Sequence, residues 1–453
     1  MSTPPVAGTV VPGARARFGW MMFDWASQPC HTLLWTFIFA PYFTSSVAPD
    51  PVTGQEMWGW GTAVAGLAVA VMSPFLGALA DATGPRKPWA LLFSIAYVVG
   101  AAMLWTAVPG DPDPVMALFW FGLALLGVEF ATVFTNAMLP DLAPPDRVGR
   151  LSGSGWALGY VGGLVSLAFT LLLLAESAET GLTLLGIPPL FGLDPELREG
   201  TRAVGPFSAL WYLVFIPPLF LWVPDAQKRG AWKGAMARGL GQLWASIKDV
   251  KNRDGLGWFL GASMLYRDAL NGFYAFGGIY AAGVLGWSIT QIGVFGVVAA
   301  LLGAIGAWIG GMADARFGPR RVVGFTLGGL ILAAVIGVSV RPGMILYVVE
   351  VPMDSGLPDI IFYCVGGMIG AFGGTLQAAS RTLVTRFADE GRMTSAFGLY
   401  ALAGKATAFL APMLIAVATG LTGDQQLGIL PVVGLFVLGY ALLAKAGSPP
   451  ARG

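Results

Sequence analysis

Charged side chains are scarce in this chain. Of its 453 residues only 11% are charged, whereas a soluble protein carries roughly 25%. Apolar residues make up 56% and fall in long unbroken runs, each near the roughly 20 residues that cross a bilayer as a helix. Together with a mean hydropathy of +0.70, these runs exclude a soluble domain and predict an all-α polytopic membrane protein.

Cysteine, histidine and net charge are scarce as well. The two cysteines, Cys30 and Cys364, lie in apolar runs, so we expect no disulfide. A net charge of +1 indicates no nucleic-acid partner. With one histidine there is no zinc-ligand pair at helical spacing, and the chain has no Gly-x-Ser-x-Gly elbow or phosphate-binding loop. We therefore expect no enzyme and no cofactor, and we find no removable signal peptide in residues 1–18.

Two similar stretches organise the chain. The first holds Gly77, Asp81, Gly84, Arg86 and Lys87, and the second, about half a chain later, holds Gly310, Asp314, Gly318, Arg320 and Arg321. Each lies between two apolar runs, as expected where a helix leaves a membrane, turns and re-enters it, with the cations on the cytoplasmic side. The repeat predicts two copies of one membrane unit.

Twelve spans can be placed on this pattern. They are predicted to begin near Phe18, Met57, Pro88, Val115, Leu151 and Pro206, and then near Gly255, Ser288, Val322, Pro358, Thr394 and Gln426. The fold class is thus two pseudo-symmetric six-helix bundles, at 1–224 and 255–453, joined by a linker at 225–254. Placing both termini in the cytoplasm leaves only Arg198, Arg202 and Arg341 in outer loops. We expect an integral protein of a bacterial-type cytoplasmic membrane in that orientation.

The linker and one outer segment stand apart from the spans. In the linker, Trp232, Leu240 and Trp244 recur at helical spacing, with lysines such as Lys233 between them. This predicts a basic amphipathic helix, which would lie on the cytoplasmic lipid surface or pack on the bundle. The outer segment 176–205 is expected to form a short lid or re-entrant piece, and nothing in its sequence indicates a function.

The repeated loop resembles the signature of the major facilitator superfamily. The first copy matches Gly-x-x-x-Asp-x-x-Gly-x-Arg-Lys position for position, and the second has one extra residue before Gly318. The resemblance covers nearly the whole chain and implies a site near the midplane between the halves, opened by alternating access. It also implies that the loop residues act as a gate, with Asp81 and Arg86 holding the cytoplasmic side shut. The alternative is a turn that only sets topology.

Two shorter motifs are similar to one branch of that superfamily. The run Phe23-Asp24-Trp25-Ala26-Ser27 and the run Tyr266-Arg267-Asp268-Ala269-Leu270-Asn271 resemble the fungal vacuolar amino-acid effluxers and their bacterial relatives, once called the unidentified major facilitator family. The resemblance implies an amino-acid substrate. His31 and Arg267 depart from the family pattern, in which smaller or uncharged residues are expected.

Ionisable side chains inside spans are costly and usually functional. In the first span, Asp24, Gln28 and His31 are spaced to share one helical face, which makes them candidates for substrate binding or proton coupling. The alternatives are a structural lock for Asp24 and simple packing for His31. The intrinsic pKa of histidine would suit proton exchange near neutral pH.

A second group lies in later spans. Arg267 and Asp268 are neighbours about 100° apart on a helix, so one is expected to reach the cavity while the other pairs with another helix. Asn271 extends the face of Arg267. Glu129 and Lys405 also lie deep, and we expect an ion pair between Lys405 and a carboxylate, either across the cavity or as a structural tie. Arg381, four residues after Gln377, is expected to act as a gate or cytoplasmic anchor.

These charges suggest a zwitterionic substrate. If they converge on one chamber between the halves, a carboxylate would meet Arg267 or Lys405, and an ammonium group would meet Asp24, Asp268 or Glu129. We therefore predict a monomeric, lipid-embedded secondary transporter for a small molecule, an amino acid above all, coupled to protons or another ion. The alternatives are an exporter of an amphiphile such as a lysolipid or drug, and a non-transporting receptor on a transporter fold.

Overall fold

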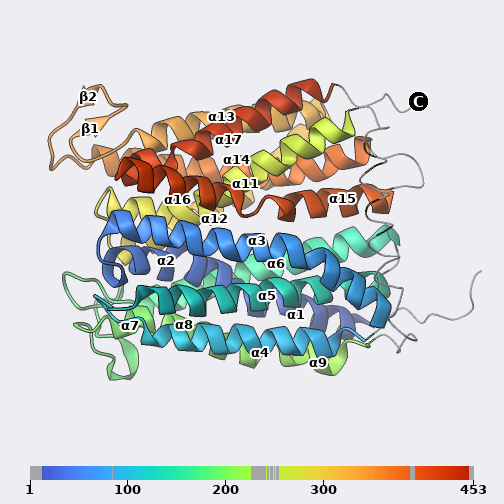
Figure 1. Ribbon diagram of the computed structural model, residues 1–453, viewed down its shortest axis with the longest axis horizontal. Helices are drawn as coiled ribbons and strands as arrows, with labels where there is room; N and C mark the ends of the chain where they lie inside the picture. The colour runs from blue at the N-terminus through green and yellow to red at the C-terminus, as the bar shows by residue number, and fades with distance from the viewer. Residues whose placement is uncertain are drawn as a thin grey trace, which may run out of the picture.

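The computed structural model describes residues 13–83, 85–143, 145–225, 255–387 and 393–447, with residues 241, 244, 248 and 250. Its helices run side by side along one axis (Figure 1). We call the end where α1 begins and α17 ends the terminal side, and the opposite end, which carries the two short strands, the hairpin side. Most of the predicted linker, including its amphipathic helix, lies outside the described residues.

The first half crosses the bundle six times. Its elements are α1 (Ala14–Pro29), η1 (Cys30–Phe37), α2 (Phe39–Tyr42), η2 (Phe43–Val47), α3 (Pro51–Thr83), α4 (Lys87–Met103), η3 (Leu104–Thr106), α5 (Pro114–Leu142), α6 (Pro145–Phe169), η4 (Thr170–Leu174), η5 (Leu190–Gly192), α7 (Glu199–Arg202), α8 (Val204–Phe215) and α9 (Pro217–Trp222). The first span is a series of four pieces, of which η1 and η2 are π-helical. Such wide turns interrupt the α-helical periodicity.

The second half repeats this pattern. Its elements are α11 (Leu256–Gly283), α12 (Ile289–Phe317), α13 (Pro319–Val338), β1 (Met344–Ile345), β2 (Val349–Glu350), α14 (Leu357–Phe387), α15 (Met393–Ala406), α16 (Leu410–Thr422) and α17 (Gln425–Lys445). The strands form an antiparallel hairpin in which Met344 pairs with Glu350. The eleventh span is broken between α15 and α16.

The predicted fold class of two six-helix bundles is confirmed. Among the described residues, ten helices are long and apolar enough to cross a membrane, and the segmented first span and the charged α11 complete the twelve. Helices α3 and α6 begin at Pro51 and Pro145, six residues before the predicted starts. Proline is favoured in the first turn of a helix, where its missing N–H has no partner to lose, so these helices start before their apolar runs.

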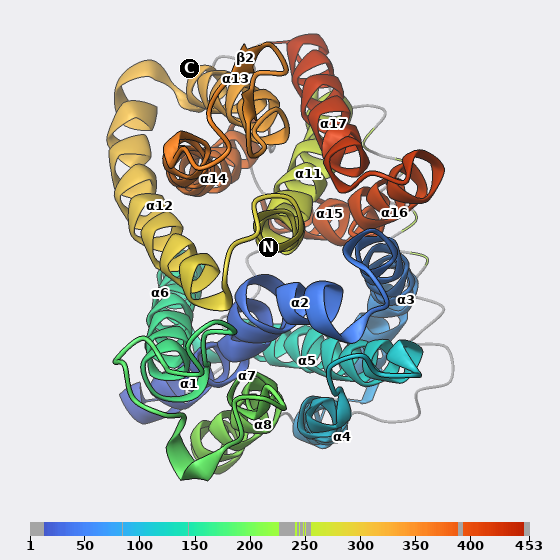
Figure 2. The same ribbon diagram turned by 90° about the vertical axis from the view of Figure 1, so that its left-hand side faces the viewer.

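The two halves meet mainly at the hairpin side. There α16 packs along α3, while α2 and η2 contact α11. Figure 2, seen from the hairpin side, shows α11 near the centre, next to α2 of the other half. Towards the terminal side the ribbons of α3 and α15 diverge (Figure 1). One continuous apolar core runs through both halves and includes Trp58, Phe121 and Phe276.

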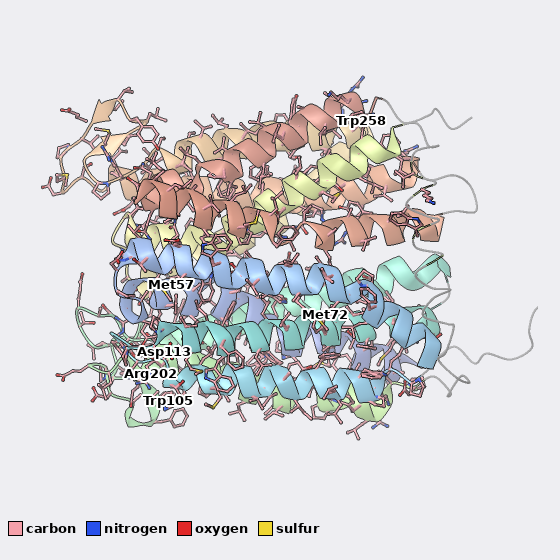
Figure 3. The ribbon with its side chains drawn as sticks, in the orientation of Figure 1. Met57, Met72, Trp105, Asp113, Arg202 and Trp258 are labelled. Atoms are coloured by element: carbon pink, nitrogen blue, oxygen red, sulfur yellow. The ribbon has the colours of Figure 1, made fainter. Side chains whose placement is uncertain are left out.

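The outer segment after the fifth span is tied down by a buried acid. Glu176 is fully buried and accepts hydrogen bonds from Arg198 Nε (2.8 Å) and from the hydroxyl (2.7 Å) and backbone N–H (3.1 Å) of Thr201. Arg202 donates to the Trp105 carbonyl and lies over its ring at 4.7 Å, as the two labelled side chains in Figure 3 show. These contacts fix the segment on the end of the N-terminal bundle.

Candidate functional site

One ion pair joins the two halves near the middle of the bundle. Lys405, at the end of α15, donates from Nζ to Oε2 of Glu129 on α5 at 2.8 Å. The side chains are 33% and 20% exposed, so water reaches the pair. A lysine at the C-terminal end of a helix also gains from the helix dipole. The predicted pairing of Lys405 with a carboxylate is confirmed, and its partner is Glu129.

His31 completes this group. It lies in the π-helical η1 with its ring 5.8 Å from that of Trp35, and it interacts electrostatically with both Glu129 and Lys405. We call His31, Glu129 and Lys405 the central cluster. It brings a titratable ring, an acid and a base from three spans together.

Asp24 and Gln28 lie elsewhere, against α6. A Cβ added to Gly155 would collide with the Asp24 carboxylate, and one added to Gly163 would approach the Gln28 side chain at 2.8 Å. Asp24 and Gln28 therefore share a face, as predicted. This face continues past the start of the π-helix at Cys30, because Gln28 donates to the Thr32 hydroxyl at 3.4 Å and Thr32 also lies against Gly163. That His31 shares this face stays a prediction.

The glycines of α6 allow this close approach. Gly155 faces Trp20 of α1, Gly159 faces Asp24 and Gly162 faces Trp25. Small residues let transmembrane helices pack closely. The stripe therefore positions the Asp24 carboxylate in the contact between two helices of one half. Among the described residues, no group donates a hydrogen bond to that carboxylate.

Substitution at this stripe gives a first prediction. We expect Gly155→Ala to lower both thermal stability and transport, because its methyl group would displace the Asp24 carboxylate and the Trp20 ring. Overpacking of this kind costs about 1–3 kcal/mol. The matched control is Gly153→Ala, where nothing lies within 4 Å of the new methyl group. Unfolding in detergent would measure both, and equal stability of the two variants would contradict the packing role.

Arg267 reaches the first piece of the broken eleventh span. Its Nη1 donates to the Tyr400 carbonyl at 2.9 Å, and its guanidinium lies over the Tyr400 ring at 4.5 Å. Gly404 provides the room, because a Cβ there would collide with the guanidinium. Arg267 is thus held by α15 and does not point freely into a chamber.

Asp268 reaches the second piece. Its Oδ2 accepts the backbone N–H of Ala411 at 2.7 Å, in the first turn of α16, and the residue is 2% exposed. A carboxylate at this position satisfies a donor that the helix leaves unpaired and faces the positive end of the helix dipole. The prediction that one of the two reaches the cavity while the other pairs with another helix is not what the contacts show: Arg267 and Asp268 both have partners in the eleventh span, and together they brace its break.

The remaining polar residues lie on α11 and α14. Asn271 is exposed, and Gln377 lies near the Tyr274 hydroxyl. The Arg381 guanidinium lies 5.9 Å from the ring centre of Trp156 on α6, in the other half. Asp24 lies between α1 and α6, and the Glu129–Lys405 pair lies between α5 and α15. Arg267 lies against Gly404, the residue before Lys405, and Asp268 lies against α16. That these charges converge on one chamber stays a prediction.

The first signature loop is fastened within its own half. Arg86 pairs with Asp141 at the end of α5. The backbone N–H groups of Arg86 and Lys87, at the start of α4, donate to Asp225 at 2.8 and 3.2 Å, and Lys87 Nζ donates to the Phe220 carbonyl at 2.8 Å. The acid at the positive end of α4 is thus Asp225. The side chain of Asp81, together with Gly84, lies outside the described residues.

The second loop repeats this arrangement. Gly318 has a φ of +82°, which glycine adopts without strain, and this turns the chain between α12 and α13. Arg320 then donates to the carbonyls of Leu443 and Ala444, both at 3.2 Å. In each half a loop cation therefore caps the carbonyl end of the last helix of the same bundle, as the helix dipole favours.

The sequence did not indicate a polar contact that closes the hairpin side. Gln55 Nε2 donates to the Thr419 hydroxyl at 2.8 Å and the Gln425 carbonyl at 3.0 Å, and Gln425 Nε2 donates to the Pro51 carbonyl at 2.7 Å. We call Gln55, Thr419 and Gln425 the hairpin-side latch. Gln55, at the start of an apolar run, could have indicated this contact, because a buried amide needs hydrogen-bond partners.

Solved structures of transporters share this fold. A D-xylose-proton symporter matches with a TM-score of 0.66 at 12% identity, covering 96% of this chain and 97% of that one. A bacterial homologue of the human lysosomal transporter Spinster, in an inward-facing conformation, matches with a TM-score of 0.65 at 15% identity, covering 95% of each chain. The chain therefore has the fold of these transporters.

Sequence comparison gives the family. Residues 59–446 match the family described as "Vacuole effluxer Atg22 like", and the chain belongs to it. The uncharacterized MFS-type transporter YxiO of Bacillus subtilis is 24% identical over 94% of this chain and 93% of that protein. Autophagy-related protein 22-1 of Aspergillus niger is 20% identical over 65% of this chain. The chain spans about half the length of the fungal relatives it matches.

Proposed function

We propose that this protein is a proton-coupled secondary transporter that moves an amino acid across the cytoplasmic membrane by alternating access. The observation that carries the proposal is the central cluster. Among the described residues, Glu129 and Lys405 form the ion pair that joins the two halves. A water-reachable pair at this place must break or rearrange when the halves rock, so its energy is tied to the conformational change.

The asymmetry of the contacts between the halves supports alternating access. The latch and the packing of α3 on α16 hold the hairpin side closed, which leaves the terminal side as the route of access in this state. We propose that the terminal side faces the cytoplasm, since Arg86, Lys87 and Arg320 lie there and the positive-inside rule places such residues inside. The boundaries 1–224 and 255–453 are proposed as the two rocking bodies.

Proton coupling is proposed for His31 and Glu129. Protonation of Glu129 would remove its attraction for Lys405 and weaken the tie between the halves. The neighbouring imidazole of His31 is a second group that can carry a proton. Asp24, whose carboxylate accepts no hydrogen bond from the part of the chain that the structure describes, is proposed to receive the substrate ammonium group or a proton.

We propose an amino acid as the substrate for two reasons. The chain belongs to a family of vacuole effluxers, and its spans contain both acids and bases, which suit the two charges of an amino acid. An exporter of an amphiphile is the second candidate, and an apolar cavity of about 60 Å³ favours it. The cavity is lined by Phe37 of the first span together with Phe273, Phe276 and Phe295 of the second half. A volume of this size accommodates a few carbon atoms, so it would receive a short part of the apolar chain of such a substrate.

Transport in proteoliposomes tests the proposal. The purified protein should exchange labelled amino acids and accumulate them when an inward or outward pH gradient is imposed, and dissipating the gradient with a protonophore should abolish the accumulation. Competition by unlabelled amino acids, lysolipids and cationic drugs identifies the substrate class. Competition by lysolipids alone would favour the amphiphile exporter, and absence of flux for every compound would favour a non-transporting receptor.

A further inference from the structure

One cation inside a predicted span has no acid beside it. Arg381 lies on α14 within the apolar stretch Leu357–Val384 and is exposed. Among the residues that the structure describes, no carboxylate forms an ion pair with it. A guanidinium group at membrane depth is costly unless it faces water, a partner or a ligand.

The other span cations are already occupied. Lys405 is paired with Glu129, and Arg267 is held by the carbonyl and ring of Tyr400. Neither can bind an anion without giving up its protein partner. Arg381 can do so at no such cost, so the anion-binding role expected of Arg267 or Lys405 passes to Arg381.

Arg381 faces an aromatic surface on the opposite half. Trp156 and Tyr160, one turn apart on α6, are 47% and 50% exposed, with ring centres 6.0 Å apart. The guanidinium lies 5.9 Å from the Trp156 ring, and its charge reaches Tyr160. Because the neighbouring Gly155 packs on α1, this aromatic face is turned away from α1 and towards α14.

We propose that Arg381, Trp156 and Tyr160 form a carboxylate-docking site on the terminal side of the transport path, for a carboxylate that carries an apolar side chain. The planar guanidinium suits a carboxylate because it can donate two parallel hydrogen bonds. The exposed rings offer contact area to an apolar side chain and hold the guanidinium by a cation–π interaction. The inference rests on the proposed function and names the site at which its substrate is first recognised.

The test separates recognition of the carboxylate from recognition of the rest of the ligand. Binding of phenylalanine, phenylalaninamide, hexanoate, hexanamide and inorganic phosphate would be measured by calorimetry on wild type, Arg381→Gln and Arg381→Lys. We expect Arg381→Gln to weaken binding of both acids by about tenfold to a hundredfold, the loss typical of a charge-assisted hydrogen bond, while binding of phenylalaninamide stays within about twofold. Arg381→Lys should be intermediate because a lysine lacks the planar fork.

Two further variants keep the test independent of folding. Arg386→Gln removes an exposed cation from the same helix and should leave every affinity unchanged. Trp156→Ala should weaken phenylalanine and phenylalaninamide alike, because it removes the apolar wall and not the charge.

The outcomes distinguish this inference from the proposed function. If phenylalanine is transported but Arg381→Gln weakens acid and amide equally, the docking site is wrong and the transporter stands. If hexanoate binds in an Arg381-dependent way while no amino acid binds, the docking site stands and the amino-acid function falls. Binding of phosphate in place of carboxylates, or of no carboxylate at all, would overturn the docking site.

Discussion

Replacing Glu129 with glutamine is expected to lower the initial transport rate by about tenfold or more, and replacing Lys405 with glutamine should do the same. Each change leaves one charge without its partner inside a span, where an unpaired charge is costly. The partial exposure of both side chains limits the loss of stability. Proteoliposome exchange and thermal unfolding would measure the two effects.

The double variant Glu129→Gln/Lys405→Gln separates structure from coupling. It contains no orphan charge, so we expect its stability to return close to that of wild type and exchange without a gradient to recover. Accumulation driven by a pH gradient should remain lost, because the titratable acid is gone. Glu350→Gln, at an exposed residue of β2, is the matched control. Wild-type accumulation in the double variant would show that the pair has no part in coupling.

The second large effect is expected at Asp268. Asp268→Ala should reduce the free energy of unfolding by about 1–3 kcal/mol, because the buried N–H of Ala411 loses its acceptor. Asp268→Asn keeps an oxygen that can accept this bond, so it should retain most of the stability and the transport activity. Denaturation of the detergent-purified variants, with transport assays beside it, provides the measurement.

Asp24→Asn is the matched comparison for this experiment. The Asp24 carboxylate accepts no hydrogen bond from the described residues, so its neutralisation should leave stability intact and abolish pH-driven uptake. A stable Asp268→Asn protein that loses pH-driven uptake would return Asp268 to the proton path and contradict its role as a brace.

Much of the fold could be predicted because apolar runs and loop charges report membrane crossings directly. The repeated loop indicated two six-helix halves, and the placement of Glu129 and Lys405 at similar depth indicated their pairing. The break in the eleventh span was missed. Pro412, two residues after the start of α16, hints at it, but proline is tolerated within membrane helices.

The roles of the site residues were harder to predict. Composition and spacing showed which charges lie inside spans, but whether each is already neutralised depends on neighbours far away in sequence. Asp268 is occupied by the N–H of Ala411 and Arg267 by the carbonyl of Tyr400, and backbone partners leave no trace in the sequence.

The side chains of the hairpin-side latch decide how this closure responds to acid. Amide and hydroxyl side chains such as those of Gln55, Thr419 and Gln425 do not exchange protons at physiological pH. At the start of α3, hydrogen bonds from Thr53 lower the pKa of Asp50, so this acid stays ionised in mildly acidic surroundings. Beside the latch, the carboxylate of Glu56 lies against Gly420. On its other side Asp424 accepts the backbone N–H groups of Gln426 and Leu427. Among the described residues, the three latch side chains therefore carry no titratable group, and acid at the hairpin side can act on this closure through the neighbouring carboxylates alone.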